Sequence, residues 1–224
     1  MPVGEGYTIG DLNSDSWPKF EEFFNKYNGV QNSCWCVYYH KKTPSPRIKK
    51  SEKANYNRNL KKKLVEEGKS RSVLVYKEDK VVASCQYGTF DELPRIQNAS
   101  RYEGLILKNE SENKWRITCF FVDTSHRHNG LAKFALDGVL DKIARSGGGL
   151  VEAYPVTKKN TVEIWFGTVN MYLERGFEVI SKFGNSNVLV RRFVEPIDDR
   201  YRSVKKVGNG SQYSHKAGED GIVK

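Results

Sequence analysis

Apolar residues recur along the chain with two different spacings, and the spacing decides which elements are predicted. Short β-rich runs bounded by turn-forming residues predict strands, whereas apolar residues at three- and four-residue intervals predict helices. The predicted strands cover about residues 7–9, 72–76, 81–88, 117–122, 150–156, 177–180 and 188–193. The predicted helices cover about residues 17–27, 51–67, 131–145 and 167–174. Because the two kinds of element are interleaved, the pattern indicates a mixed α/β domain.

The most informative junction joins the apolar strand at 117–122 to the amphipathic helix at 131–145. The connecting turn begins at Arg127 and contains Gly130 and Ala132, which are too small to cover the backbone. A turn that meets a helix N-terminus in this way presents free N–H groups to an anion. We therefore expect an anion-binding turn at this junction.

A second pattern lies about forty residues further along the chain. The short helix predicted at 167–174 stops at Arg175 and Gly176, and Phe177 follows directly. Tyr172 stands four residues before that glycine.

Together the two patterns resemble the GNAT superfamily of acyl-CoA N-acyltransferases. Arg127 to Ala132 fits the pyrophosphate-binding signature Gln/Arg-x-x-Gly-x-Gly/Ala, and Tyr172 takes the tyrosine position of the signature Leu-Tyr-x-x-x-Gly-Phe. The order and separation of the two patterns match as well, and the resemblance covers about residues 72–193. One position departs, because many members carry an asparagine seven residues before the tyrosine and this chain has Trp165 there.

The resemblance implies a single GNAT domain over residues 1–196, with an α/β fold in which helices flank both faces of a mixed, mostly antiparallel central sheet. A polar insert at about 90–113 has no assigned place in that sheet. Residues 197–224 are rich in Gly, Ser, Lys and Asn and are predicted to form a flexible polar tail. The resemblance also implies acetyl-CoA as co-substrate and direct acetyl transfer to a primary amine.

The same resemblance implies roles for individual residues. The turn would bind the cofactor pyrophosphate, and backbone N–H groups at the end of the central strand would hold the thioester carbonyl. The implied cofactor-binding residues are Phe121, Val122, Arg127, His128, Asn129, Gly130, Leu131 and Ala132. Tyr172 would donate a proton to the departing thiolate, and its alternative role is that of a core tyrosine.

The general base has several candidates. Glu152 lies inside an apolar strand, where an acid is costly unless it faces a cleft or has a partner. We choose Glu152, with Asp91, Glu92 or a chain of water molecules as alternatives. Cys119 is interpreted as a small core residue rather than a nucleophile, because no histidine stands at a recognisable partner position.

Aromatic residues are dense between positions 33 and 40, where Trp35, Tyr38 and Tyr39 stand close together. In the GNAT family this region lines the acceptor side, so these three residues are candidates for the wall of the acceptor pocket. The alternative is a core strand or plug, because most buried aromatic residues serve packing.

Positive charge is concentrated in one segment. Residues 41–63 hold ten basic residues against the single acid Glu52, which accounts for nine of the ten net positive charges of the chain. The helical half of this segment, about 51–67, places Tyr56, Leu60 and Leu64 on one stripe with lysines around it. A solvated helix face is the default interpretation. Alternatives are steering of the anionic cofactor, or attraction of an acidic acceptor or a nucleic acid.

Length and composition agree with one intracellular domain. The chain has 224 residues and no apolar run long enough to span a bilayer, so we expect a cytoplasmic protein that does not enter membranes. Its four cysteines indicate reduced thiols rather than a disulfide framework, and no metal-binding spacing is present. The oligomeric state, monomer or homodimer, is left open.

Two classes of function follow from these observations. The first is an N-acetyltransferase that acts on a small-molecule amine through a ternary complex. The second is a GNAT-like module that binds acyl-CoA for regulation without rapid turnover. Tyr172 favours the enzyme, because a pure binder needs no acid at that position. Within the enzyme class, the basic segment keeps open an amine on a protein or a nucleic acid.

Overall fold

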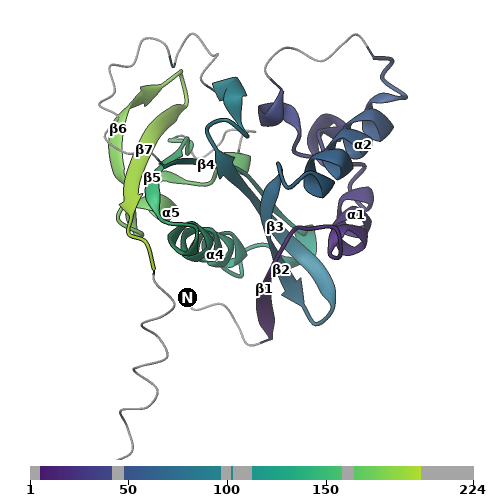
Figure 1. The fold of residues 1–224 in the computed structure, drawn as a ribbon, viewed down its shortest axis with the longest axis horizontal. Helices are drawn as coiled ribbons and strands as arrows, with labels where there is room; N and C mark the ends of the chain where they lie inside the picture. The colour runs from purple at the N-terminus through teal and green to yellow at the C-terminus, as the bar shows by residue number, and fades with distance from the viewer. Residues whose placement is uncertain (1–5, 42–47, 97–101, 103–112, 158–163, 198–224) are drawn as a thin grey trace, which may run out of the picture.

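The computed structural model describes residues 6–41, 48–96, 102, 113–157 and 164–197, which form seven strands in one sheet (Figure 1). The strand order is β1-β2-β3-β4-β5-β7-β6, and every neighbouring pair is antiparallel except β4 and β5. The strands are β1 (Tyr7–Asp11), β2 (Arg71–Lys77), β3 (Lys80–Thr89), β4 (Lys114–Val122), β5 (Gly149–Ala153), β6 (Glu178–Phe183) and β7 (Asn187–Val194). The predicted mixed, mostly antiparallel sheet is confirmed.

Helices cover both faces of the sheet, as expected. Helices α1 (Trp17–Asn25) and α2 (Lys53–Glu66) lie on one face, and α4 (Leu131–Arg145) and α5 (Val169–Leu173) lie on the other (Figure 1). The alternation of side chains along β2 separates two cores, because Val73 packs with α4 whereas Leu74 packs with α1. At Gly138 the helix α4 comes so close to the sheet that an added Cβ would lie 2.7 Å from Ile9 Cδ1.

The parallel pair β4 and β5 separates part of the way along its length. The pairing runs from Lys114 opposite Leu150 to Ile117 opposite Ala153, where β5 ends, whereas β4 continues to Val122. On the other edge of β4 the register with β3 shifts, so that Thr118 is an extra residue between two pairs. Such a bulge bends and twists the strand that carries it. On the β5 side, the last five residues of β4 therefore border a wedge, although β3 still pairs with them on the other side.

Helix α2 presents a different face to the protein from the one that its apolar spacing predicts. Its buried residues are Asn57, Lys61 and Val65, whereas Tyr56 is 39% exposed and Leu60 is only half-buried. The predicted stripe is therefore wrong by one position, and the lysine-rich face is not wholly solvated. The physical reason is polar satisfaction, because the Lys61 ammonium finds two buried oxygen acceptors, described below.

The tail beyond residue 197 and most of the insert at 90–113 lie outside the described residues. The part of the insert that is described contains the 3₁₀ turn η3 (Pro94–Ile96), which packs its buried residues against the α2 side of the sheet. No helix in the described part of the chain has the length and hydropathy that a membrane span needs.

Candidate active site

The predicted anion-binding turn forms between β4 and α4. The chain leaves β4 through the 3₁₀ turn η4 (Thr124–His126), extends at Arg127 and enters α4 at Gly130. Gly130 is the N-cap, with φ 76° and ψ 4°, a left-handed conformation that glycine adopts without the strain of a Cβ. No side chain caps this helix and its first turn carries no acid. The positive end of the α4 dipole is therefore open to an external anion.

Asp123 fixes the start of this turn. Its carboxylate accepts hydrogen bonds from the Ser125 N–H at 2.9 Å, the Ser125 hydroxyl at 2.7 Å and the Lys26 ammonium at 2.7 Å. Burial alone would raise the pKa of Asp123, but these hydrogen bonds outweigh it and hold the pKa well below its usual range. The Thr124 N–H also donates to the Tyr27 hydroxyl at 3.2 Å. The end of α1 and the turn are thus held together.

The predicted cofactor-binding residues divide into side chains that solvent reaches and side chains that pack. Arg127, His128 and Asn129 are exposed, and Leu131 is buried in the core under α4. Phe121 packs its ring against Phe23, Phe24 and Tyr27 of the α1 region, with centroids 5.2, 5.8 and 4.8 Å away. Phe121 and Leu131 therefore anchor the two ends of the turn, and the side chains between them are open to solvent.

Tyr172 lies beside the part of β4 that β5 does not reach, with its ring centroid 6.4 Å from that of Phe120. Its side chain is fully buried, and its hydroxyl donates to the carbonyl of Phe166 at 3.2 Å. Phe166 belongs to the 3₁₀ turn η5 (Ile164–Phe166), which packs against β4 beyond the end of β5. Burial raises the pKa of Tyr172 well above its usual value, so the phenol stays protonated at neutral pH. The Tyr172 hydroxyl is therefore protonated and held by the Phe166 carbonyl.

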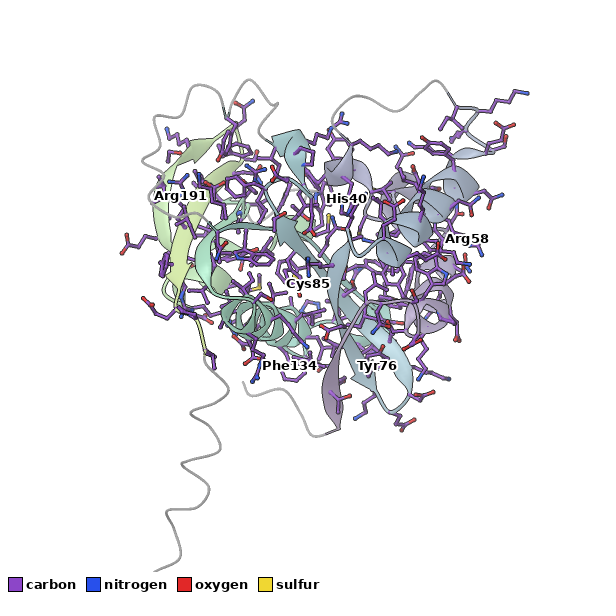
Figure 2. All side chains as sticks on the ribbon, in the orientation of Figure 1. His40, Arg58, Tyr76, Cys85, Phe134 and Arg191 are labelled. Atoms are coloured by element: carbon purple, nitrogen blue, oxygen red, sulfur yellow. The ribbon has the colours of Figure 1, made fainter. Side chains whose placement is uncertain are left out.

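Glu152, the predicted base, lies in a buried polar cluster. Its carboxylate accepts from Arg191 Nε at 2.8 Å and from the Tyr154 hydroxyl at 2.7 Å, and the Tyr102 hydroxyl lies 3.1 Å away. Arg116 Nε lies 3.9 Å from the same carboxylate, and both side chains are fully buried. Figure 2 shows Arg191 on β7, toward the edge of the sheet that lies away from α2. The side chain therefore has partners that satisfy a buried charge, whatever else it does.

The alternative bases also have structural partners. Glu92 accepts from the Thr89 N–H at 2.9 Å and pairs with Arg71 Nε at 3.1 Å. Asp91 is exposed in the turn that follows β3. Neither observation places a free carboxylate at the wedge.

The three aromatic candidates on the acceptor side have three different environments. Trp35 is only 2% exposed and packs against Trp17 and Phe24 in the core under α1, as the plug alternative describes. Tyr39 is buried and its ring contacts Phe166 at 5.8 Å between centroids. Tyr38 is 48% exposed, and the Arg95 guanidinium lies 4.0 Å from its ring centroid. Of the three, Tyr38 is the side chain that a solvent-borne acceptor can reach.

A buried series of hydrogen bonds on the α2 side of the sheet was not predicted from the sequence. Lys61 is fully buried and donates to the Ser70 hydroxyl at 2.7 Å and to Gln86 Oε1 at 3.0 Å. Ser70 Oγ in turn lies 3.0 Å from His40 Nε2, and His40 Nδ1 lies 2.8 Å from the Glu92 carbonyl. Because a carbonyl only accepts, Nδ1 carries the proton and Nε2 accepts from Ser70. Figure 2 shows His40 on the side of the sheet that α2 covers.

Burial and the nearby Lys61 charge lower the pKa of His40 to about 3, so its ring is neutral in the folded protein. The sequence did not indicate these buried hydrogen bonds, because Lys61 is one of three consecutive lysines, which a helix usually exposes to solvent. Within the described ranges, no group of three His, Cys, Asp or Glu side chains is arranged to hold a metal ion.

The wedge between β4 and β5 and the uncapped turn before α4 agree with the class of acetyl-CoA-dependent acetyltransferases. A profile of the Acetyltransferase (GNAT) family matches residues 17–177, and the chain belongs to this family. None of the curated proteins compared matches this sequence.

Solved structures share the fold at low sequence identity. Ribosomal-protein-S5-alanine acetyltransferase from Vibrio fischeri is 9% identical with a TM-score of 0.50, and the match covers 85% of this chain and 94% of that one. PaiA N-acetyltransferase from Thermoplasma acidophilum, solved with coenzyme A, is 13% identical with a TM-score of 0.48, over 84% and 98% of the two chains. YncA from Salmonella typhimurium, solved with acetyl-CoA, is 14% identical with a TM-score of 0.46, over 85% and 95%.

Proposed function

We propose that this protein transfers the acetyl group of acetyl-CoA to a primary amine of a small-molecule acceptor by direct attack within a ternary complex. The observation that carries the proposal is a buried, protonated phenol, that of Tyr172, near the end of β4. The uncapped turn before α4 follows β4 along the chain. A module that only binds acyl-CoA needs the turn but has no use for an acid at the wedge.

The turn at Arg127–Ala132 fits a pyrophosphate. Gly130 leaves the entrance to α4 without a side chain, and Arg127 is exposed beside it, where it can add a charge-assisted hydrogen bond. Acetyl-CoA, when bound, supplies the activated acetyl group as a thioester. The residues of this chain bind its phosphates and orient that group.

The end of β4 supplies a donor for the thioester carbonyl. Asp123 N–H donates to the Val82 carbonyl on β3 at 2.8 Å. Since successive N–H groups of a strand point to opposite edges, the N–H of Val122 points toward the wedge. We therefore assign the carbonyl contact to Val122, and Phe121 then supports the strand through its packing. A fixed backbone donor of this kind stabilises the charge that develops on the carbonyl oxygen.

Tyr172 would protonate the departing thiolate. The phenol would release the Phe166 carbonyl and donate its proton to sulfur, a change of acceptor that needs only a rotation of the hydroxyl. General acid catalysis of this kind contributes about 10²- to 10⁴-fold to a rate.

Glu152 as the general base stays a prediction. A base needs a free lone pair at the amine, and the donors around Glu152 occupy its oxygens in the protein without substrate. A water chain that accepts the amine proton is the alternative, with Glu152 then holding Arg116 and Arg191 in place. The Glu152→Gln variant described in the Discussion separates the two.

The acceptor is proposed to enter beside Tyr38, whose exposed ring lies under Arg95. Lys41 lies nearby on the same loop, with its ammonium 5.2 Å from the Tyr56 ring and 2.9 Å from Asn57 Oδ1. These cations favour an acceptor that also bears negative charge. An amine on a protein or nucleic acid is the second candidate, because Lys41, which belongs to the basic segment and contacts α2, lies beside this entrance.

Calorimetric titration with acetyl-CoA, with CoA and ATP as controls, tests the first part of the proposal. Saturable binding of acetyl-CoA and CoA, but not of ATP, is expected. A screen of amines for acetyl-CoA consumption then tests the transfer. An acceptor on a macromolecule would lose affinity steeply as salt rises, whereas a small neutral amine would not. Absence of acetyl-CoA binding would leave the family fold without this activity.

A further inference from the structure

The Lys61 ammonium has no carboxylate as a partner among the residues that the structure describes. Its two hydrogen bonds go to the Ser70 hydroxyl at 2.7 Å and to Gln86 Oε1 at 3.0 Å, and both oxygens are neutral. The Lys61 side chain is also fully buried, so water does not screen its charge. A buried cation is costly unless an opposite charge balances it. The site therefore has room in its charge balance for one anion.

Gln86 and Thr118 add polar groups that have no partner. An ammonium only donates, so the Gln86 amide must turn its oxygen to Lys61, and its nitrogen is left for another acceptor. In the described part of the chain, Gln86 Nε2 and Thr118 Oγ1 are both buried without a hydrogen-bond partner. Buried polar groups are nearly always paired in folded proteins. Two unpaired groups near one unbalanced cation therefore indicate a ligand that accepts hydrogen bonds.

The sheet brings these groups to one face. Gln86 on β3 pairs with Cys119 on β4, and Thr118 is the extra residue of the bulge before that pair. Gln86 reaches Lys61 and so points to the face that α2 covers. Ile117 packs in the core under α4, and alternation along a strand turns the next residue, Thr118, to the opposite face. We call Lys61, Gln86 and Thr118 the donor cluster.

The donor cluster borders a part of β4 that solvent reaches. Cys119, directly after Thr118, is partly exposed, and so is Phe121. Both pack on the α1 side of the sheet. The pairing of β4 with β5 has already ended at Ile117. A ligand that enters the wedge from this side therefore arrives next to the donor cluster.

We propose that the donor cluster binds a carboxylate of the acceptor, so that the substrate is an amine that also carries a carboxylate. The inference rests on the proposed function, because it names the substrate class of that site. Both oxygens of a carboxylate only accept hydrogen bonds, and the donor cluster offers the ammonium, the amide N–H groups and a hydroxyl. The hydrogen bond from Lys61 would be charge-assisted, which makes it stronger than one to a neutral oxygen.

The charge of Lys61 also orients the acceptor. It attracts a carboxylate and repels an ammonium, so the carboxylate end lies at the donor cluster. The amine end then points along β4 toward Val122, whose N–H is assigned to the thioester carbonyl. Burial lowers the pKa of Lys61, and a bound carboxylate would oppose this shift by supplying the missing negative charge.

Calorimetric titration of the full chain in the presence of CoA tests the carboxylate without requiring acetyl transfer. The probes are glycine, β-alanine, γ-aminobutyrate and L-lysine, which separate the amine from the carboxylate by different lengths, and the amide of each is its control. At least one acid should bind, and its amide should bind at least about tenfold more weakly, because the amide leaves the cation unbalanced. Equal affinities for acid and amide, or no binding by any of these acids, would overturn the proposal.

Thr118→Val removes the unpaired hydroxyl and keeps the shape of the side chain. Because no partner is lost, the free energy of unfolding should hold or rise, whereas the affinity for the acid that binds should fall by about tenfold. Ser181→Ala on β6 is the matched control, since Ser181 Oγ is also buried without a partner in the described ranges. It should leave the affinity unchanged, and equal affinities of the two variants would contradict the proposal.

Gln86→Glu places the missing negative charge inside the protein. The new carboxylate would pair with Lys61, remove the amide donor and repel the carboxylate of the ligand. The variant should therefore keep or gain stability and bind CoA normally, and it should lose measurable binding of the acid. Retained affinity for the acid in a folded variant would contradict the proposal.

The acetylation rates of the same acids and amides separate this inference from the proposed function. Acetyl transfer at equal efficiency to acid and amide would leave the proposed function intact and refute the donor cluster. Selective binding of an acid, lost in the Thr118 and Gln86 variants but without any acetyl transfer in the native protein, would support the donor cluster and refute the proposed function.

Discussion

The Tyr172 hydroxyl donates a hydrogen bond to the Phe166 carbonyl at 3.2 Å, and this contact ties α5 to the 3₁₀ turn η5, which packs against β4. The contact keeps the phenol oriented at the wedge when no thiolate is present. It also gives the residue a structural role, which a test of catalysis must separate from the chemical one.

Tyr172→Phe removes the proton donor but keeps the ring that packs against Phe120 and Phe177. Turnover should fall by about 10²-fold or more, with acetyl-CoA affinity almost unchanged. The lost hydrogen bond should lower the free energy of unfolding by about 1 kcal/mol. Steady-state kinetics, calorimetry and thermal unfolding measure the three quantities. Tyr76→Phe, remote from the wedge, is the control, and full turnover in the Tyr172 variant would remove the assignment.

Gly130→Val should abolish binding at the turn. Valine adds a side chain where the phosphate would lie and is strained at a φ of 76°. Gly68→Val is a matched control, since Gly68 has a φ of 67° and no heavy atom within 4 Å of an added Cβ. Both variants should lose similar stability. Only the first should weaken CoA binding, by at least about tenfold, and equal affinities for the two variants would contradict the anion-binding turn.

Glu152→Gln tests whether the carboxylate is a base or a structural partner. The variant leaves Arg116 and Arg191 without their buried charge partner, so we expect a loss of about 3–5 kcal/mol in the free energy of unfolding. Glu195→Gln, at an exposed position, should change stability little. If Glu152 is also the base, turnover of the folded variant will fall as well, and the pH dependence of kcat/KM will change. Denaturant unfolding and a pH–rate profile distinguish these outcomes.

His40 should make the protein less stable in acid. Its pKa is about 3 in the folded state against about 6.5 when unfolded, so between these values the unfolded chain binds the extra proton. Stability from this residue is therefore complete above about pH 6.5 and is lost as the pH falls toward 3, by up to about 1.4 kcal/mol per pH unit. His40→Gln should flatten the dependence in denaturant unfolding. His128→Gln, at an exposed position, should leave it unchanged.

Lys61→Met should slow alkylation of Cys36. The ammonium lowers the pKa of this thiol, so an apolar side chain of similar length raises that pKa and reduces the thiolate fraction at neutral pH. Lys62→Met is the control, because the Lys62 side chain is exposed and pairs with Glu66. Iodoacetamide labelling followed by peptide mass spectrometry measures the rate. An unchanged rate at Cys36 would show that Lys61 does not activate it.

The parts of the fold that follow from local sequence were predicted well. Gly130 and Tyr172 belong to short patterns whose spacing is set by one strand, one turn and one helix, so the sequence alone placed them. The long helix α4 also appeared where its periodicity indicated, because it buries a single apolar face.

The parts that depend on distant contacts were not predictable. Glu152 receives its partners from β4, from β7 and from residue 102, which no local pattern connects. Lys61 can be buried because its ammonium donates hydrogen bonds to Ser70, just before β2, and to Gln86 on β3. Its spacing on α2 placed it among the solvated lysines. The aromatic residues near position 35 likewise have the same local composition but three different degrees of burial.

The contacts of Lys26 with Asp123 and of Tyr27 with Thr124 connect the end of α1 to the turn before α4. Under the proposed function, these contacts would link the half of the site for a phosphate-bearing ligand to the half for an amine. Any ligand that shifts α1 changes the affinity of the turn for its anion, and reciprocity requires the anion to change the affinity for that ligand by the same factor. A change to this one ion pair at the end of α1 would therefore alter both affinities together.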